Sequence, residues 1–218
     1  LKRQCIFNFC VNKFKIYRYG YHGLSASSVL RDIQDRKIII CHLGGGSSIT
    51  VVKNGKSIDT SMGFTPIEGI MGSTRSGNFD VGALLYLGKK LGFTKLLDYF
   101  CFESGLKGVG GDSRLHLLLK SKNKRAKLAV DKYVYDVKKQ IGSYFSILGG
   151  LDIIVFTGVI GERSWKIREY ICEGLDALGI KLNHAKNRKN KLGFIHKGKV
   201  KIKVIKISES NEIYMEML

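Results

Sequence analysis

The sequence predicts an α/β fold, in which strands and helices alternate along the chain. Two apolar runs of strand length, Ile38–Cys41 and Leu151–Phe156, each lie just before a cluster of glycines. Between them, residues 126–148 carry apolar side chains at helical spacing, which is typical of a long amphipathic helix. Alternation of buried strands with amphipathic helices is typical of the α/β class.

The first strongly patterned part of the chain is expected to form strand, glycine loop, strand, tight turn and strand. Lys37–Leu43 is the first strand, and it ends at the loop Gly44–Ser48. Ile49–Lys53 is the second strand, and Asn54-Gly55 follows it as a two-residue turn because both residues tolerate positive φ. Lys56–Asp59 begins the return strand.

Helical spacing of apolar residues predicts helices over 81–91, 94–102 and 126–148. The apolar face of the last helix is formed by Val130, Val134, Val137, Ile141, Phe145 and Leu148.

After the strand Leu151–Phe156, Thr157–Glu162 is expected to form a second glycine loop that leads into a helix. Ser164 is the expected N-cap of that helix, and Gly179 is placed to end it. Its apolar face would carry Ile167, Ile171, Leu175 and Leu178. Lys199–Ile207 alternates Lys with Val or Ile, which is typical of a half-exposed strand.

Composition favours a cytoplasmic globular protein. Apolar residues make up 44% of the 218, and the five cysteines are scattered without metal-ligand spacing, as expected of reduced thiols. No apolar run has the length of a membrane span, and the start of the chain has no signal-peptide pattern. The net charge of +19 comes mostly from Lys spread along the chain without interleaved aromatic residues. A solvated basic surface is therefore favoured over nucleic-acid binding.

The two glycine clusters indicate phosphate binding, since glycines let the backbone approach a phosphate closely. The first is the loop within His42–Ser48, and the second is Thr157–Glu162, where a helix N-terminus would favour an anion. Either cluster alone is most often a simple turn. Two of them, each after a buried strand, indicate a nucleotide site.

Two polar residues have competing interpretations when the residues alone are considered. His22 lies among aromatic residues and glycines, and a hydrogen-bonded core histidine is its plainer interpretation. Arg75 lies in a glycine-flanked loop, where it is either a surface arginine or a bidentate ligand for a planar anion.

The segment Val51–Gly77 closely resembles the acetate kinase family, above all in Asp59-Thr-Ser-Met-Gly-Phe-Thr-Pro-Ile-Glu-Gly69. Supporting matches follow in the family's order at Arg18–Gly23, His42–Ser48, Ser104–Gly108, Asp112–Arg114, Phe156–Ser164 and Glu173–Ile180. The resemblance implies the acetate and sugar kinase, Hsp70 and actin superfamily fold, which is ribonuclease H-like, with two α/β domains that close over a nucleotide. It divides the chain into 1–18, a remnant of the N-terminal region, and 19–218, the nucleotide-binding C-terminal domain.

The resemblance also implies an activity, reversible phosphoryl transfer from ATP to acetate that gives acetyl phosphate and ADP, with Mg²⁺. His22 and Arg75 would stabilise the phosphoryl group in flight through positioning and charge. The residues that would line the ATP phosphates are His42, Leu43, Gly44, Gly45, Gly46, Ser47 and Ser48. The adenosine end would be contacted by Asp112, Ser113 and Arg114, and the nucleotide site completed by Gly158, Val159, Ile160, Gly161 and Glu162. The metal ligand would be Glu212, with Glu209 as the alternative.

Several departures from the family pattern bear on activity. The family's first-half segment, which supplies a substrate arginine and a catalytic aspartate, is absent from these residues, so low activity of the chain alone is expected. Gly45 and Arg163 each stand where asparagine is usual, Ala26 stands for a histidine, and Val159 stands for a glycine. Val159 is expected to matter most, because a β-branched residue resists positive φ and adds bulk where the backbone should approach the nucleotide.

Three hypotheses stay open. The first is acetate kinase chemistry, performed only when another chain supplies the missing N-terminal portion, or performed by an ancestor and now lost. A homodimer or a complementing N-terminal chain is the expected partner. The second is a non-catalytic nucleotide-binding or dimerisation module. The third is a propionate or butyrate kinase, towards which Gly45 points.

Overall fold

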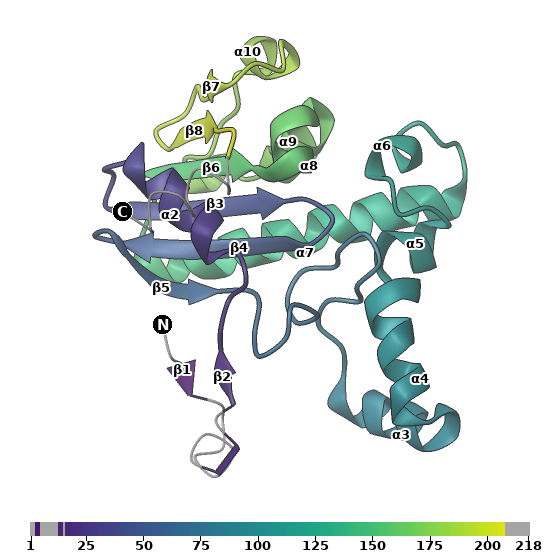
Figure 1. The fold of residues 1–218 in the computed structure, drawn as a ribbon. Helices are drawn as coiled ribbons and strands as arrows, with labels where there is room; N and C mark the ends of the chain where they lie inside the picture. Colours follow the sequence, from purple (N-terminus) through teal and green to yellow (C-terminus); the bar gives the residue numbers. More distant parts are fainter. Residues whose placement is uncertain (1–2, 5–12, 15, 208–218) are drawn as a thin grey trace.

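The computed structural model describes residues 3–4, 13–14 and 16–207. A six-stranded mixed sheet lies between helices on both faces, so the predicted α/β class is confirmed (Figure 1). The strands are β1 (Arg3–Gln4), β2 (Tyr17–Arg18), β3 (Lys37–Leu43), β4 (Ser47–Lys53), β5 (Lys56–Thr60), β6 (Ile153–Thr157), β7 (Gly193–Phe194) and β8 (Lys201–Val204). The α-helices are α2 (Gly23–Arg31), α3 (Val81–Leu91), α4 (Phe93–Asp98), α5 (Gly105–Gly110), α6 (Leu115–Leu118), α7 (Lys124–Leu148), α8 (Gly158–Arg163), α9 (Trp165–Cys172) and α10 (His184–Arg188). A π-helical turn η1 (Tyr99–Glu103) and a 3₁₀ helix η2 (Asp176–Leu178) complete the described elements.

The strand order in the large sheet is β5-β4-β3-β6-β8-β7. β3, β4 and β5 form an antiparallel meander, and the Asn54-Gly55 turn between β4 and β5 has positive φ at both residues, as predicted. β3 pairs in parallel with β6, and β6 pairs in parallel with β8. The carboxyl ends of β3 and β6 therefore meet at one edge of the sheet, although more than a hundred residues separate them in sequence.

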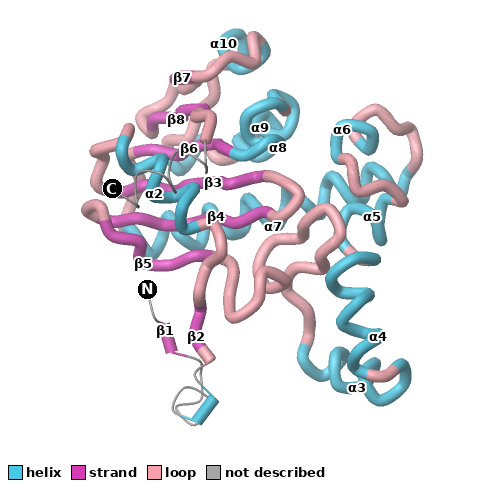
Figure 2. Tube along the Cα trace, viewed as in Figure 1, coloured by secondary structure: helices cyan, strands magenta, loops and turns pink. Residues whose placement is uncertain are grey.

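Each face of the sheet has its own apolar core, because successive side chains of a strand point to opposite faces. Figures 1 and 2 show α7 running along one face and α2 crossing the other. Ile39 and Cys41 of β3 pack towards α7, while Ile38 and Ile40 pack towards α2. Asn123 caps the start of α7 through its side chain, and Gly149 in the left-handed conformation ends it.

Helices α3 and α4 project from the rest of the chain (Figure 1). Asp80 caps α3 by accepting a hydrogen bond from Ala83 N at 2.8 Å. Their buried residues are only Gly88 and Leu96. Apolar side chains of this arm that remain exposed are Val81, Leu85, Tyr86, Leu91, Phe93 and Leu97, followed by Tyr99 and Phe102 of η1.

The predicted helix from Ser164 to Gly179 is shorter than expected. α9 ends at Cys172, because Gly174 adopts a φ of +74° and breaks the helical path. Leu175 and Leu178 therefore lie beyond the helix, and Gly179 closes η2 instead. Ser164 holds the N-cap position of α9 but makes no side-chain capping bond.

Some predictions fall outside what the structure describes. Glu209 and Glu212, the alternative metal ligands, lie in 208–218 and are outside the described residues. The boundary between 1–18 and 19–218 stays a prediction. Within 3–18, β1 pairs antiparallel with β2 in a separate two-stranded sheet.

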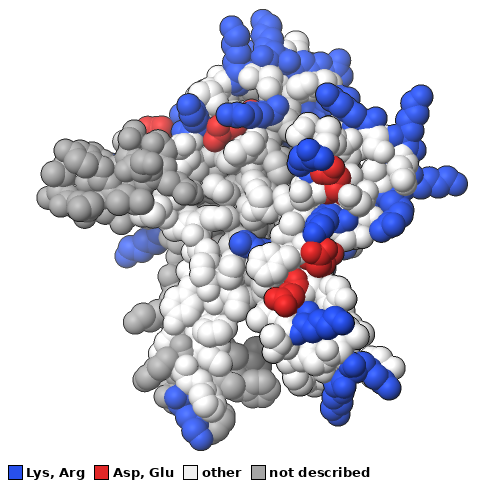
Figure 3. Space-filling view, turned by 45° about the vertical axis from the view of Figure 1, so that its right-hand side comes forward, with Lys and Arg blue, Asp and Glu red and all other residues white. Residues whose placement is uncertain are grey.

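Across the described residues, none of the helices has both the length and the apolar character needed to span a bilayer. Figure 3 shows Lys and Arg side chains gathered along the upper and right-hand edges of one face, with few acidic side chains among them. The exposed lysines of the C-terminal part include Lys186, Lys189, Lys191, Lys197 and Lys199.

Candidate nucleotide site

The two glycine junctions predicted from the sequence lie side by side. They follow β3 and β6, and the register of these parallel strands places His42 opposite Thr157. Gly158 has a φ of +75°, and a Cβ there would lie only 2.6 Å from the Leu43 carbonyl oxygen. Glycine is required at this position because any other residue would collide with the end of β3.

The second junction is a helix rather than a loop, which corrects the sequence prediction. Gly158–Arg163 forms α8 directly after β6. Positive φ falls on Gly158 and not on Val159, so the resistance of a β-branched residue to positive φ has no effect here. Val159 is 62% exposed, and the effect of its bulk on a nucleotide stays a prediction. Gly161 is buried against β3, whereas Ile160 and Glu162 are half-buried.

A cavity of about 590 Å³ opens beside both junctions. Its lining residues are Gly45, Ser73, Ser113, Arg114, Leu115, His116, Val159, Ile160, Arg163 and Ser164. Five of these, namely Gly45, Ser113, Arg114, Val159 and Ile160, are predicted site residues from three separate segments. The volume lies within the range typical of small-molecule sites. Ser73 and His116 were missed, because nothing in their local pattern distinguishes them from other loop residues.

Asp112 holds Arg114 at the rim of this cavity. Asp112 Oδ1 accepts from Arg114 N at 2.8 Å and from Nε at 3.0 Å, and Oδ2 accepts from Nη2 at 2.8 Å. These hydrogen bonds from Arg114 lower the pKa of Asp112 to about 2. The aspartate is therefore ionised at neutral pH and favours this orientation of the arginine, whose side chain is 64% exposed.

The Gly44–Gly46 loop is covered by Arg75. Arg75 Nη1 lies 2.8 Å from the position that a Cβ on Gly46 would occupy. Ser73 N donates to the Gly45 carbonyl oxygen at 2.9 Å, which ties the loop that carries Arg75 to the glycine loop. Gly105, with a φ of +65°, lets α5 approach the same loop, since a Cβ there would be 2.4 Å from Gly72 O.

His22 lies at the opposite side of the first junction. It holds the N-cap position of α2, and its ring stacks on that of His42 with centroids 4.0 Å apart. His22 Nδ1 is 2.8 Å from Ser48 Oγ, and Ser48 is buried. The structure thus brings His22, His42 and Ser48 together at the carboxyl end of β3. The guanidinium of Arg75 lies next to Gly46 of the same junction.

A buried arginine supports α8 from behind, and sequence reasoning missed it. Arg168 of α9 is fully buried, and its Nη1 donates to Gly161 O at 2.7 Å and to Glu162 O at 2.9 Å. Nε donates to Asn187 Oδ1 and Nη2 to Asn190 Oδ1, both at 2.8 Å. Burial lowers the pKa of Arg168 to about 10, so the guanidinium remains charged at neutral pH.

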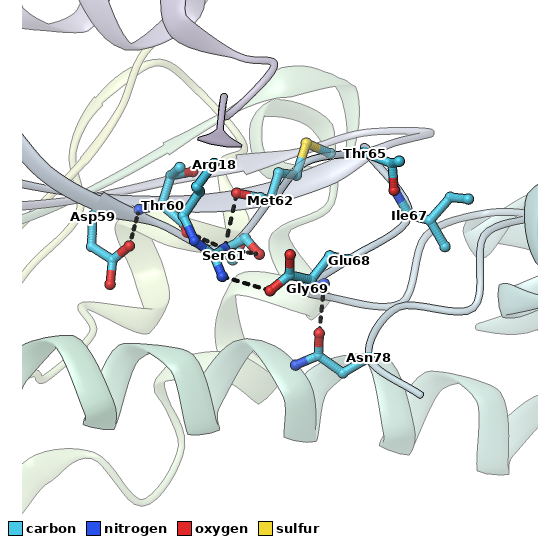
Figure 4. Close-up of polar contacts among 10 residues, drawn as sticks. All are labelled: Arg18, Asp59, Thr60, Ser61, Met62, Thr65, Ile67, Glu68, Gly69 and Asn78. Atoms are coloured by element: carbon cyan, nitrogen blue, oxygen red, sulfur yellow. Dashed lines mark hydrogen bonds and ion pairs between the residues drawn. The ribbon is translucent and has the colours of Figure 1, made fainter. Parts of the chain in front are cut away.

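The Asp59–Gly69 segment is held in place by Arg18 (Figure 4). Arg18 Nη1 donates to Thr60 O at 3.1 Å and to Met62 O at 3.0 Å, and Nη2 forms an ion pair with Glu68 Oε1 at 2.6 Å. Asn78 Oδ1 accepts from Gly69 N at 2.8 Å at the far end of the segment. The segment therefore has a structural role, since it leads from β5 to the loop that carries Arg75.

Within the described part of the chain, no three His, Cys, Asp or Glu side chains come close enough to form a metal centre. The predicted magnesium ligands, Glu212 or Glu209, lie outside the described residues, so the magnesium site stays a prediction.

The profile described as the Acetokinase family matches residues 5–216. The chain belongs to the acetokinase family. It is 45% identical to an acetate kinase of Thermoanaerobacter pseudethanolicus over 93% of this chain and 54% of that protein. It is 43% identical to an acetate kinase of Protochlamydia amoebophila over 89% of this chain and 52% of that protein.

Two solved structures of the acetokinase family share the whole described fold. The acetate kinase of Porphyromonas gingivalis superposes with a TM-score of 0.93 at 34% identity, covering 99% of this chain and 59% of that one. A propionate kinase from Francisella tularensis superposes with a TM-score of 0.92 at 36% identity, with the same coverage. The fold class predicted by resemblance is therefore confirmed. The chain spans about half the length of the curated relatives, 54% in the first case.

Proposed function

We propose that this chain carries the nucleotide-binding part of an acetate kinase, which transfers a phosphoryl group between ATP and acetate. One observation supports the proposal most strongly. Segments around Gly45, Arg114 and Val159, which are far apart in sequence and all match the family, line a single cavity next to Arg75. Family membership and the acetate kinase relatives agree with this assignment.

In this proposal the adenosine end of the nucleotide lies in the cavity against Ser113, Arg114 and α8. The phosphates lie along Gly44–Ser47, where small residues let the backbone approach closely. Arg114 is pre-oriented by Asp112, so less side-chain freedom is lost when a ligand binds.

At the other end of the loop, Arg75 and His22 would act on the transferred phosphoryl group. The guanidinium of Arg75 supplies charge above Gly46, and Ser48 orients the His22 ring. Catalysis of phosphoryl transfer depends almost entirely on such positioning and charge stabilisation. We also propose that Glu212, or alternatively Glu209, would bind the Mg²⁺ that accompanies the nucleotide.

The test is formation of acetyl phosphate from ATP, Mg²⁺ and acetate, trapped as the hydroxamate. The chain is assayed alone and together with a polypeptide corresponding to the first half of a relative. We expect turnover in the second assay that His22→Ala and Arg75→Ala each abolish. ATP binding without turnover in either assay would leave the nucleotide-binding module as the function. Replacing acetate by propionate or butyrate decides the acyl preference, for which the propionate kinase relative is the structural precedent.

We further propose that the chain forms a homodimer through the arm of α3 and α4, which exposes apolar side chains over much of its length. Leu85→Glu is expected to weaken self-association about thirtyfold, since a central apolar contact is worth about 2 kcal/mol. The matched control is Leu128→Glu, which is 59% exposed and belongs to α7 instead of the arm. Sedimentation equilibrium measures both. A wild-type chain that is monomeric at all concentrations, or equal effects of the two variants, would contradict the arm as the dimer contact.

A further inference from the structure

A buried tyrosine lies beneath the first glycine loop. Tyr133 of α7 is fully buried, and its hydroxyl is 2.9 Å from Ser47 Oγ. The apolar periodicity of α7 runs through Val130, Val134 and Val137 and gives no reason to expect a hydroxyl there. A buried tyrosine hydroxyl usually has a specific partner, and here that partner is the residue that ends the loop.

The hydroxyl of Ser47 connects Tyr133 to the start of the loop. Ser47 Oγ accepts from Gly44 N at 3.3 Å and donates to Gly44 O at 3.2 Å. A serine hydroxyl has one hydrogen to donate and two lone pairs to accept with. The contact between Ser47 Oγ and the Tyr133 hydroxyl at 2.9 Å is a further hydrogen bond of the same serine, and either oxygen can be the donor. Three hydrogen bonds therefore meet at the Ser47 hydroxyl.

Burial keeps the Tyr133 hydroxyl protonated. Burial raises the pKa of the phenol, since desolvation disfavours the charged form, so the proton stays on the oxygen. Ser47 is itself buried, with 1% of its surface exposed, so water does not easily replace a lost partner.

The loop held in this way has an open side. A Cβ at Gly45 would meet nothing within 4 Å, and Gly45 lines the cavity, whereas Gly46 lies under Arg75. Hydrogen bonds from Ser47 fix one end of the loop, and Ser73 N fixes Gly45 O from the side. Helix α7 therefore helps to fix, through Tyr133 and Ser47, the backbone of Gly44–Gly46 that faces a ligand.

We propose that Tyr133 is a positioning residue, which fixes the phosphate-binding loop through Ser47. This inference rests on the proposed function, because it assumes that the loop receives the phosphates of a nucleotide. Tyr133 touches no ligand in this proposal. It acts by holding Gly44 in one conformation, so that little loop freedom is lost on binding.

The test removes a single oxygen atom. Tyr133→Phe keeps the ring and its packing but removes the hydroxyl that bonds to Ser47. Tyr144→Phe is the matched control, a second buried tyrosine on the same helix. We expect Tyr133→Phe to raise the Kd for ATP about tenfold and leave the Kd for adenosine unchanged, since one buried hydrogen bond is lost only at the phosphate loop. Tyr144→Phe should leave the ratio of the two constants as in the wild type. If Tyr133 only supported the overall fold, Tyr133→Phe would raise the Kd for ATP and the Kd for adenosine by the same factor.

A second readout does not depend on nucleotide. Amide hydrogen exchange in residues 43–48 should accelerate about tenfold in Tyr133→Phe and remain at the wild-type rate in Tyr144→Phe. Unchanged exchange in this loop, or an equal change in both variants, overturns the inference. If the wild type binds no ATP, the proposed function fails, while the exchange rates still decide whether Tyr133 holds the loop.

Discussion

Replacing Arg168 with methionine should destabilise the chain by about 3–5 kcal/mol, because it strips the donors from a buried cluster of acceptors. The affected oxygens are Gly161 O, Glu162 O, Asn187 O, Asn187 Oδ1 and Asn190 Oδ1. Methionine keeps an apolar stem but is shorter than arginine and has no donors, so the loss combines the unpaired acceptors with the space that the guanidinium leaves. Urea unfolding followed by the fluorescence of the single tryptophan, Trp165, measures it.

The control for this substitution is Lys166→Met, an exposed residue of the same helix. Its effect should stay within about 0.5 kcal/mol, as is usual for surface changes. The Arg168 cluster also extends beyond its own bonds, since Asn190 Nδ2 donates to Arg163 O and Asn187 Nδ2 donates to Trp165 O. Arg168→Lys keeps the positive charge but loses the planar, multidentate guanidinium that holds α8. Because α8 borders the candidate site, the affinity for nucleotide should fall in this variant. Equal stability of the two methionine variants would show that the cluster does not hold α8.

Gly46→Ala should reduce the rate of acetyl phosphate formation about a hundredfold while leaving the fold intact. Gly46 does not adopt positive φ, so alanine brings no backbone strain. Its methyl group would lie 2.8 Å from Arg75 Nη1, and the guanidinium is the flexible end of a side chain, so it would move aside. A displacement of about 1 Å of a group that positions the reacting atoms costs about a hundredfold in rate. The hydroxamate assay, with any complementing polypeptide supplied equally to all variants, measures the loss.

Gly142→Ala is the matched control, because a Cβ there meets nothing within 4 Å and the residue lies on α7. Its rate should equal that of the wild type, and its stability should rise slightly through helix propensity. Gly46→Ala should keep more activity than Arg75→Ala, because it displaces the guanidinium without removing it. Turnover of Gly46→Ala equal to that of Gly142→Ala would mean that the position of the guanidinium does not limit the reaction.

Much of the fold was predictable because local periodicity is strong where one face of an element is buried. The run Lys37–Leu43, the turn Asn54-Gly55 and the helix over 126–148 appear within a few residues of the predicted bounds. The error at α9 arose because Leu175 and Leu178 continue the helical spacing after the backbone has left the helix at Gly174. Apolar spacing records which side chains are buried, not which backbone carries them.

The candidate site was predictable only in part. Glycine clusters after apolar runs identified both junctions, and the family motifs identified Arg75 and His22, whose roles stay proposals. Ser73 and His116 line the cavity without any local pattern that marks them. The roles of Arg168 and Tyr133 could not be predicted either, because a buried polar residue is recognised only once its hydrogen-bond partners are known.

The sequence by itself determined the α/β class, most element positions, the glycine junctions and membership of the acetokinase family. Tertiary structure alone decided that the two junctions meet, because the parallel pairing of β3 with β6 is a contact between distant segments. It also decided that Gly158 opens a helix, that Arg75 lies over Gly46, and that α7 reaches Ser47 through Tyr133. Each of these features is a contact between segments that lie far apart in the sequence. Local propensity depends only on neighbouring residues, so it cannot predict such contacts.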